Sequence, residues 1–170
     1  MDERFVRTAL VFGEEGIARL LNARVAVFGI GGVGGHCVQA LARAGIGAMD
    51  VFDDDVVSIT NINRQAVAMT STIGRPKVEV IRDQILDINP IAKVECRRMF
   101  YTPENADSVD LSVYDYIVDA IDTVKAKQEL ICRAKALEVP IISAMGAGNK
   151  LDPTRRWLSH SLKHVRISTD

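Results

Sequence analysis

A glycine-rich turn that could bind phosphate follows the apolar run 25–28 and contains Gly29, Gly31, Gly32 and Gly34. Because glycine has no Cβ atom, backbone amides in such a turn can approach phosphate oxygens closely. The Ala-rich segment 35–44 has no proline, which predicts a helix whose N-terminal dipole faces the same anion. The glycine spacing also fits the dinucleotide fingerprint, so the turn predicts a nucleotide site without specifying the nucleotide.

Two cations and an amide lie in the connections between later apolar segments, at Asn61, Arg64 and Lys77. Arginine presents a planar fork to phosphate and lysine a point charge, and Pro76 fixes where Lys77 points at the start of its helix. Two cations and an amide are more than a nicotinamide needs and favour a nucleoside triphosphate. The simpler alternative is that both cations are surface charges, with Lys77 balancing Glu79 or Asp83.

Three acidic residues end the second predicted strand: Asp53, Asp54 and Asp55. An acidic residue at the carboxyl end of this strand suits a ribose hydroxyl, and we assign that role to Asp53. For Asp54 we favour a solvated strand end. Asp55 could cap a helix or support the site.

A further carboxylate, Asp122, follows the predicted strand 114–120. The carboxyl ends of parallel strands meet at one edge of a sheet, so Asp122 is expected near the phosphates, where its oxygens could hold Mg²⁺. Asp122 could also cap the helix that begins near Thr123, and capping is compatible with metal binding.

The elements that position these residues alternate between strands and helices. Strands are predicted at residues 24–29, 48–53, 93–98, 114–120 and 139–143. Helices are predicted at residues 14–21, 35–44, 77–88 and 124–137, with a short helix capped by Thr102. This alternation indicates an α/β fold with a doubly wound, mostly parallel, Rossmann-like sheet.

The amino-acid composition indicates the cellular compartment and limits the class of protein. The chain has 170 residues, of which 48% are hydrophobic and 25% charged, and a formal net charge of −1. These values exclude a disordered chain and leave any contact with nucleic acid to a local basic patch. The three cysteines form no C-x-x-C pair, which argues against a zinc or dithiol site and fits the cytoplasm. Neither a secretory signal nor a membrane span is expected.

Several motifs share an order and spacing with a known family: G-I-G-G-V-G, D-D-D-V-V-S-I-T-N-I-N-R-Q, G-R-P-K and D-A-I-D-T. Together they resemble the ATP-dependent activating enzymes of the ubiquitin-activating type, which include MoeB, ThiF and HesA. Within this superfamily the chain is most similar to the tRNA threonylcarbamoyladenosine dehydratases, through A-R-A-G-I-G at 42–47, the doubled asparagine of 60–64 and G-A-G-N-K-L-D-P-T at 146–154. The resemblance covers about residues 3–155.

The resemblance implies ATP and Mg²⁺ as cofactors. It assigns the four glycines to the ATP phosphates and Asp53 to the ribose. Asn61, Arg64 and Lys77 fall on positions that contact the triphosphate, and Asp122 on the one that binds magnesium. Arg7, within R-F-V-R at 4–7, falls on an arginine that reaches into the active site of the partner protomer, so a homodimer is expected.

The activity that the resemblance implies is ATP-dependent adenylation of a carboxylate, most specifically the dehydration of threonylcarbamoyladenosine in tRNA to its cyclic form. The alternatives are MoeB- or ThiF-like adenylation of a carrier-protein C-terminus and a nucleotide-binding Rossmann protein without this chemistry. The ATP-binding domain is expected over residues 1–154. Residues 155–170 depart from the family pattern, and one hypothesis is a truncated or frameshifted tail.

Overall fold

The computed structural model describes residues 2–145 and, for the backbone alone, residues 158–161. The strands are β1 Arg24–Phe28, β2 Ala48–Phe52, β3 Lys93–Arg97, β4 Tyr116–Asp119, β5 Ile141–Ala144 and β6 Leu158–Ser161. The α-helices are α1 Val6–Asn22, α2 Gly34–Ala44, α3 Lys77–Ile88 and α4 Val124–Ala136. The strands form one sheet in the order β3-β2-β1-β4-β5-β6. Strands β1 to β5 are parallel and β6 is antiparallel to β5, so the predicted mostly parallel α/β fold is confirmed.

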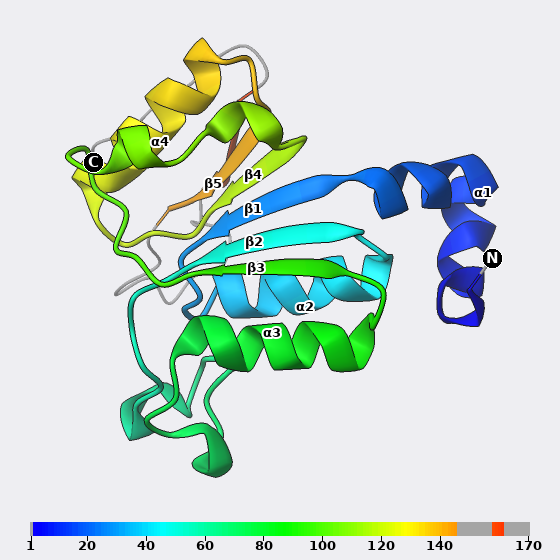
Figure 1. Cartoon of the computed structure of the whole chain (residues 1–170), viewed down its shortest axis with the longest axis horizontal. Coiled ribbons are helices and arrows are strands. Elements are labelled where there is room, and N and C mark those ends of the chain that lie inside the picture. Colours follow the sequence, from blue (N-terminus) through cyan, green and yellow to red (C-terminus); the bar gives the residue numbers. More distant parts are fainter. Residues whose placement is uncertain (1, 146–157, 162–170) are drawn as a thin grey trace.

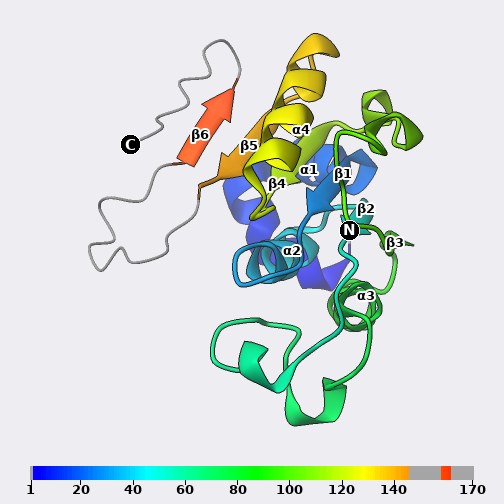
Figure 2. The ribbon, with the colours of Figure 1, turned by 90° about the vertical axis from the view of Figure 1, so that its left-hand side faces the viewer.

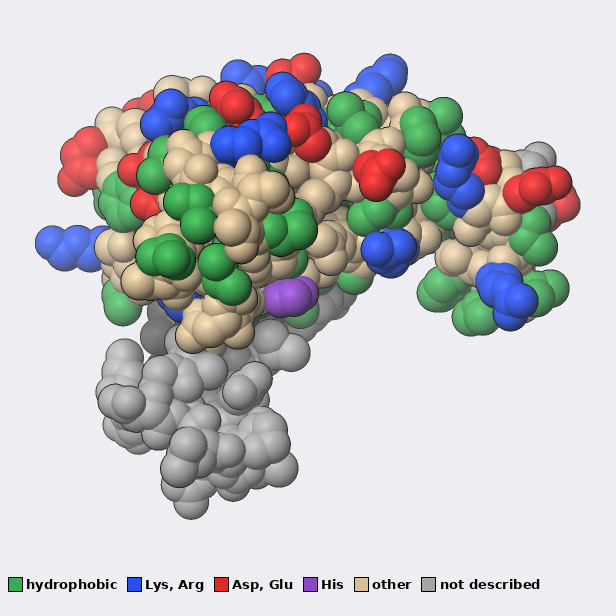
Figure 3. Space-filling view, turned by 90° about the horizontal axis from the view of Figure 1, so that it is seen from below, with side chains coloured by type: hydrophobic (Ala, Val, Ile, Leu, Met, Phe, Trp, Pro, Cys, Tyr) green, Lys and Arg blue, Asp and Glu red, His purple; other side chains and the backbone are tan. Residues whose placement is uncertain are grey.

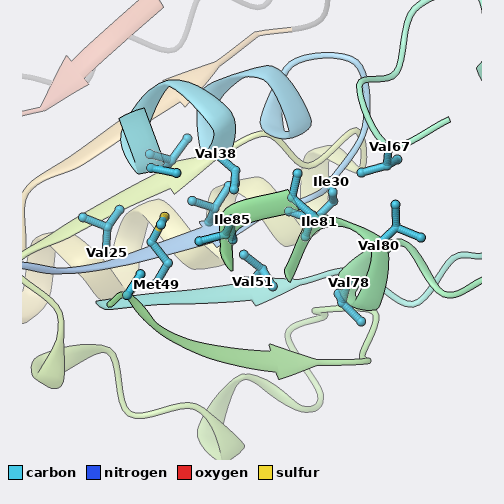
Figure 4. Close-up of a cluster of buried hydrophobic side chains, with 14 of the residues drawn as sticks. Val25, Ile30, Val38, Met49, Val51, Val67, Val78, Val80, Ile81 and Ile85 are labelled. Atoms are coloured by element: carbon cyan, nitrogen blue, oxygen red, sulfur yellow. The ribbon is translucent and has the colours of Figure 1, made fainter. Parts of the chain in front are cut away.

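Helices cover both faces of the sheet (Figures 1 and 2). On one face α2 and α3 bring Val38 and Ile81 into a hydrophobic core with Val51 (Figure 4). On the other face Leu130 of α4 shares a second core with Phe28. The chain winds outward from β1 to β3 and then crosses to β4 on the other side of β1. This reversal separates the loops that follow β1 and β4, which opens a crevice at their carboxyl ends.

Helix α1 begins earlier than the predicted helix 14–21 and is bent. Gly13 has φ 73° and ψ 171°, a conformation open essentially only to glycine, and it divides the helix in two. Phe5 is buried against Gly45, whereas the following turns leave three large side chains exposed: Leu10, Val11 and Phe12. Helix α1 projects beyond the amino ends of the strands (Figure 1), and hydrophobic side chains lie along one edge of its tip, beside charged ones (Figure 3).

The predicted helix capped by Thr102 is wrong. The amide of Thr102 donates to Asn105 Oδ1 at 2.9 Å, and a short 3₁₀ helix, Ala106–Ser108, follows with Asn105 at its N-cap. Apart from α1, the other predicted strands and helices agree with the structure to within two residues at each end. None of the helices in the described part of the chain is long and apolar enough to cross a membrane.

Candidate active site

A cavity of about 580 Å³ opens at the carboxyl ends of β1, β2 and β4. Its walls come from the glycine-rich turn, the acidic residues after β2, the crossover segment before α3, the first turn of α3, and the segments after β3 and β4. The predicted site residues in these walls are Gly29, Gly31, Gly32, Asp53, Asn61, Arg64, Lys77 and Asp122. The crevice of the doubly wound sheet therefore gathers residues that are far apart in sequence.

The glycines of the turn serve two different purposes. Gly29 has φ 89°, and a Cβ atom on it would lie 2.6 Å from the carbonyl oxygen of Ala120. A Cβ atom on Gly34 would overlap the carbonyl oxygen of Gly29, and Gly34 is buried beneath the turn instead of lining the cavity. Gly31 has no atom within 4 Å of the corresponding Cβ position. Gly29 and Gly34 therefore allow the turn to pack, whereas Gly31 leaves its backbone open to a ligand.

Asp53 is held firmly at the end of β2. Its Oδ2 accepts from the amide of Ile30 at 2.7 Å and its Oδ1 accepts from the amide of Asp55 at 2.9 Å. The pKa of the Asp53 carboxyl lies above its usual value because the carboxyl is buried. These two hydrogen bonds and the Lys77 ammonium oppose this effect but do not outweigh it. The carboxylate is thus fixed in direction, with lone pairs left to accept from a ligand hydroxyl.

Lys77 lies at the start of α3 and is only 4% exposed. Its Nζ donates to Asp55 Oδ2 at 2.6 Å and lies 4.0 Å from Asp53 Oδ1. The alternative pairing of Lys77 with Glu79 or Asp83 is wrong, because the ion pairs of Lys77 are with Asp53 and Asp55. Asp55 thus orients the buried ammonium, which is the supporting role considered for it.

Asn61 and Arg64 come from the 3₁₀ turn in the crossover segment between β2 and α3. Asn61 Oδ1 accepts from the amide of Ser58 at 3.0 Å, which fixes the turn. The exposed guanidinium of Arg64 donates through Nη1 to the carbonyl of Thr60 at 3.1 Å and to Asn63 Oδ1 at 2.9 Å. No carboxylate within the described residues pairs with it, so Arg64 can turn toward an anion in the cavity.

Asp122 lies in the turn between β4 and α4, exposed at the cavity wall. The N-cap of α4 is Thr123, without a side-chain capping bond. Within residues 2–145, Asp122 makes no hydrogen bond or ion pair, so no other group there competes for its carboxylate. A hard oxygen ligand in this position suits Mg²⁺.

Comparison with known proteins agrees with this geometry. The model of the ThiF family matches residues 5–162, which is most of the chain. The chain belongs to the ThiF family. One curated relative in this family, a tRNA threonylcarbamoyladenosine dehydratase from Bacillus subtilis, is 45% identical over 155 residues, covering 91% of this chain and 61% of the relative. The enzyme of the same name from Escherichia coli is 40% identical over 164 residues, covering 96% of this chain and 61% of that one.

A solved structure of the Escherichia coli dehydratase TcdA in complex with ATP matches with a TM-score of 0.83 and 41% identity. The match covers 89% of this chain and 63% of that one. Relatives with other names match over a smaller part of the chain: molybdopterin-synthase adenylyltransferase from Escherichia coli is 35% identical over 138 residues, which is 78% of this chain. The chain therefore spans 61% of the length of the Bacillus subtilis and Escherichia coli dehydratases.

Of the site residues expected in a ThiF-family protein, Arg7 lies away from the cavity. It is on the first turn of α1, at the amino ends of the strands, whereas the cavity lies at their carboxyl ends (Figure 1). The G-A-G-N-K-L-D-P-T motif at 146–154 lies outside the described residues, as do the side chains of 155–170. The family match ends at residue 162, within the segment expected to be an atypical tail.

Sequence reasoning missed the apolar part of the cavity wall. Phe28 and Phe52 stack with ring centroids 4.1 Å apart, and Tyr101 packs edge-on against Phe28 at 5.1 Å. Met99 and Phe100 extend this wall from the segment after β3. The only signal in the sequence was the run M-F-Y directly after a predicted strand, and its position at the sheet edge could have identified it.

Proposed function

We propose that this chain is the ATP-binding part of an enzyme that adenylates a carboxylate, and that the carboxylate belongs to threonylcarbamoyladenosine in tRNA. The product would be the cyclic form of this nucleoside. The observation that carries the proposal is the cavity, whose walls join the glycine turn, a buried lysine, an arginine with no carboxylate partner among the described residues, and the carboxylates of Asp53 and Asp122. The 45% identity to a dehydratase supports the choice of substrate.

The phosphates of ATP fit the side of the cavity formed by the glycine turn. The open backbone at Gly31 and the N-terminus of α2 offer amide donors. Lys77 contributes an ammonium group that Asp55 orients. Arg64 contributes a planar guanidinium group with N–H donors that remain unused. Asn61 presents its remaining amide donors from the same turn.

The two carboxylates suit different parts of the nucleotide. Asp53, which backbone amides hold rigid, would accept from ribose hydroxyls. Asp122, which has no partner in the described part of the chain, would hold Mg²⁺ against the phosphates. When bound, the ion would neutralise charge on the phosphoryl group under attack.

The proposed chemistry has two steps. A carboxylate oxygen of the substrate attacks the α-phosphorus of ATP, which forms an acyl adenylate and releases pyrophosphate. The neighbouring urea group of the same nucleoside then displaces AMP and closes a ring, with net loss of water. Lys77 and Arg64 assist the first step by stabilising the negative charge that develops on the phosphoryl oxygens.

We infer further that the enzyme is a cytoplasmic homodimer in which Arg7 completes the site of the partner. Within one chain, α1 lies at the end of the molecule opposite the cavity (Figure 1), so Arg7 cannot serve its own site without a large movement. The exposed Leu10, Val11 and Phe12 beside it provide an apolar surface for a second copy.

The test is pyrophosphate exchange together with mass spectrometry of tRNA nucleosides from a deletion strain and its complement. We expect ATP-dependent exchange, and loss of the cyclic nucleoside on deletion with recovery on complementation. Adenylation of a carrier-protein C-terminus with unchanged tRNA would refute the substrate and favour the MoeB-like alternative. Thermal stabilisation by NAD but not by ATP·Mg²⁺ would refute the nucleotide.

A further inference from the structure

A second group of polar side chains lies just behind the cavity, where β4, β5 and α4 meet. It consists of Asp119, Lys127 and Ser143, which are 0%, 8% and 2% exposed. None of the three lines the cavity, and none of the roles given above uses them. A buried lysine and a buried aspartate are costly unless both are paired and fully hydrogen-bonded.

Lys127 satisfies all of its donors within this group. Its Nζ donates to Asp119 Oδ2 at 2.7 Å, to Ser143 Oγ at 3.2 Å and to the carbonyl of Ala144 at 3.0 Å. Because an ammonium group has three hydrogens, none is left for a ligand. Ser143 Oγ in turn donates to Asp119 Oδ2. The group therefore fixes the orientation of Asp119 from two sides.

A hydrogen bond links the fixed Asp119 carboxylate to the turn that carries Asp122. Its other oxygen, Oδ1, accepts from the amide of Ile121 at 3.0 Å. The amide of Ala120 donates to the carbonyl of Phe28 at 2.8 Å, which anchors the start of the same turn to β1. Since the Asp122 side chain has no partner in the described part of the chain, its direction depends on the backbone of this turn.

We propose that Lys127 is a positioning residue for Asp122. By fixing Asp119, it sets the backbone of residues 120–123 and thus the direction in which the Asp122 carboxylate meets Mg²⁺·ATP. An apolar pair could stabilise this part of the core equally well, but it would not fix a carboxylate. This inference rests on the proposed function, because it takes Asp122 to be the magnesium ligand.

The decisive variant is the double substitution Lys127→Met with Asp119→Asn. It leaves no uncompensated buried charge, so we expect an unfolding temperature near that of the wild type. ATP binding is then measured by calorimetry over a series of Mg²⁺ concentrations. We expect the Mg²⁺ concentration for half-maximal binding to rise about tenfold or more, the usual consequence of losing a residue that orients a metal ligand. In the absence of nucleotide, amide hydrogen exchange at Ile121 should be faster in the double variant than in the wild type.

Lys135→Met on the exposed side of α4 is the matched control and should change neither measurement. Ser143→Ala is the milder variant if the double variant does not fold, and it should shift both measurements in the same direction by less. Unchanged Mg²⁺ dependence and unchanged Ile121 exchange in a folded variant would overturn the positioning role while leaving the proposed function intact. If the wild-type chain binds no ATP at any Mg²⁺ concentration, the proposed function fails and this role fails with it.

Discussion

Replacing Lys77 with methionine separates the stabilising contribution of this residue from its contribution to ATP binding. Methionine keeps most of the length and apolar volume of the side chain but removes the charge. The variant loses the 2.6 Å ion pair with Asp55 and leaves Asp53 without the cation 4.0 Å away. Asp53 keeps both of its backbone hydrogen bonds, so β2 should still end in the same conformation.

The expected loss of stability is small. The side chain of Asp55 is 64% exposed, so its pair with Lys77 is worth at most about 1 kcal/mol. At an effective dielectric constant of about 20, a cation 4.0 Å from Asp53 contributes about 4 kcal/mol of attraction, most of which offsets the desolvation of the buried ammonium. We expect a net loss of about 1–2 kcal/mol, or a fall of about 2–8 °C in unfolding temperature for a domain of this size.

The expected loss of ATP affinity is larger. A hydrogen bond from a buried ammonium to a phosphate is worth about 1.5–3 kcal/mol, which weakens ATP binding by about 10- to 150-fold. Calorimetric titration with ATP·Mg²⁺ and a thermal melt of the same sample measure the two effects. Lys93→Met, an exposed lysine on β3, is the control and should alter neither. An unchanged dissociation constant in a folded Lys77→Met variant would show that Lys77 does not contact the phosphates.

Three further predictions concern packing, ionisation and assembly. Gly34→Ala should prevent folding, because the Cβ would overlap the backbone, whereas Gly31→Ala should fold and bind ATP less tightly. Burial raises the pKa of Tyr101 to about 12, so the unfolded chain releases this proton near pH 10 and the folded protein does not. Wild-type stability should therefore fall from pH 10 to 12, and Tyr101→Phe should make this fall smaller in pH-dependent melts, while Tyr114 and Tyr116, whose pKa values burial also raises, account for part of what remains. Mixing Arg7→Ala with Asp122→Ala chains should restore part of the activity, and no recovery after verified subunit exchange would favour a site built from one chain.

The fold could be predicted from the sequence because its signals are local. The runs that form β1 and β2 are short, mostly apolar and followed directly by glycine or aspartate. The Gly13 bend could not be predicted, since residues 6–12 form a helix whose hydrophobic side chains stay exposed. Such a segment does not pack on the core of its own chain. Its hydrophobic residues therefore need not follow the helical spacing by which a buried helix is predicted.

Most of the predicted site residues line the cavity, but how they pair with one another could not be predicted, and their roles in binding stay predictions. Asp53, Lys77 and Asp122 could be chosen because each follows a strand or begins a helix, and Arg64 because it lies in the polar connection between β2 and α3. That Lys77 bonds to Asp55 depends on how the crossover segment packs against α3, where Lys77 also donates its amide to the carbonyl of Asp55. Such contacts form between residues that are far apart in the sequence, so no short sequence pattern indicates them.

The position of the cavity between two separate cores has a mechanical consequence. Lys77 belongs to the layer of α2 and α3 on one face of the sheet, whereas Tyr101 packs into the layer of α4 on the other. A nucleotide that touches both would act as a crosslink between these layers and oppose their sliding. Fluctuations that open the crossover segment would become rarer, because they would first have to release the ligand. The bound protein should then resist proteolytic cleavage in this segment even where its global unfolding is unaffected.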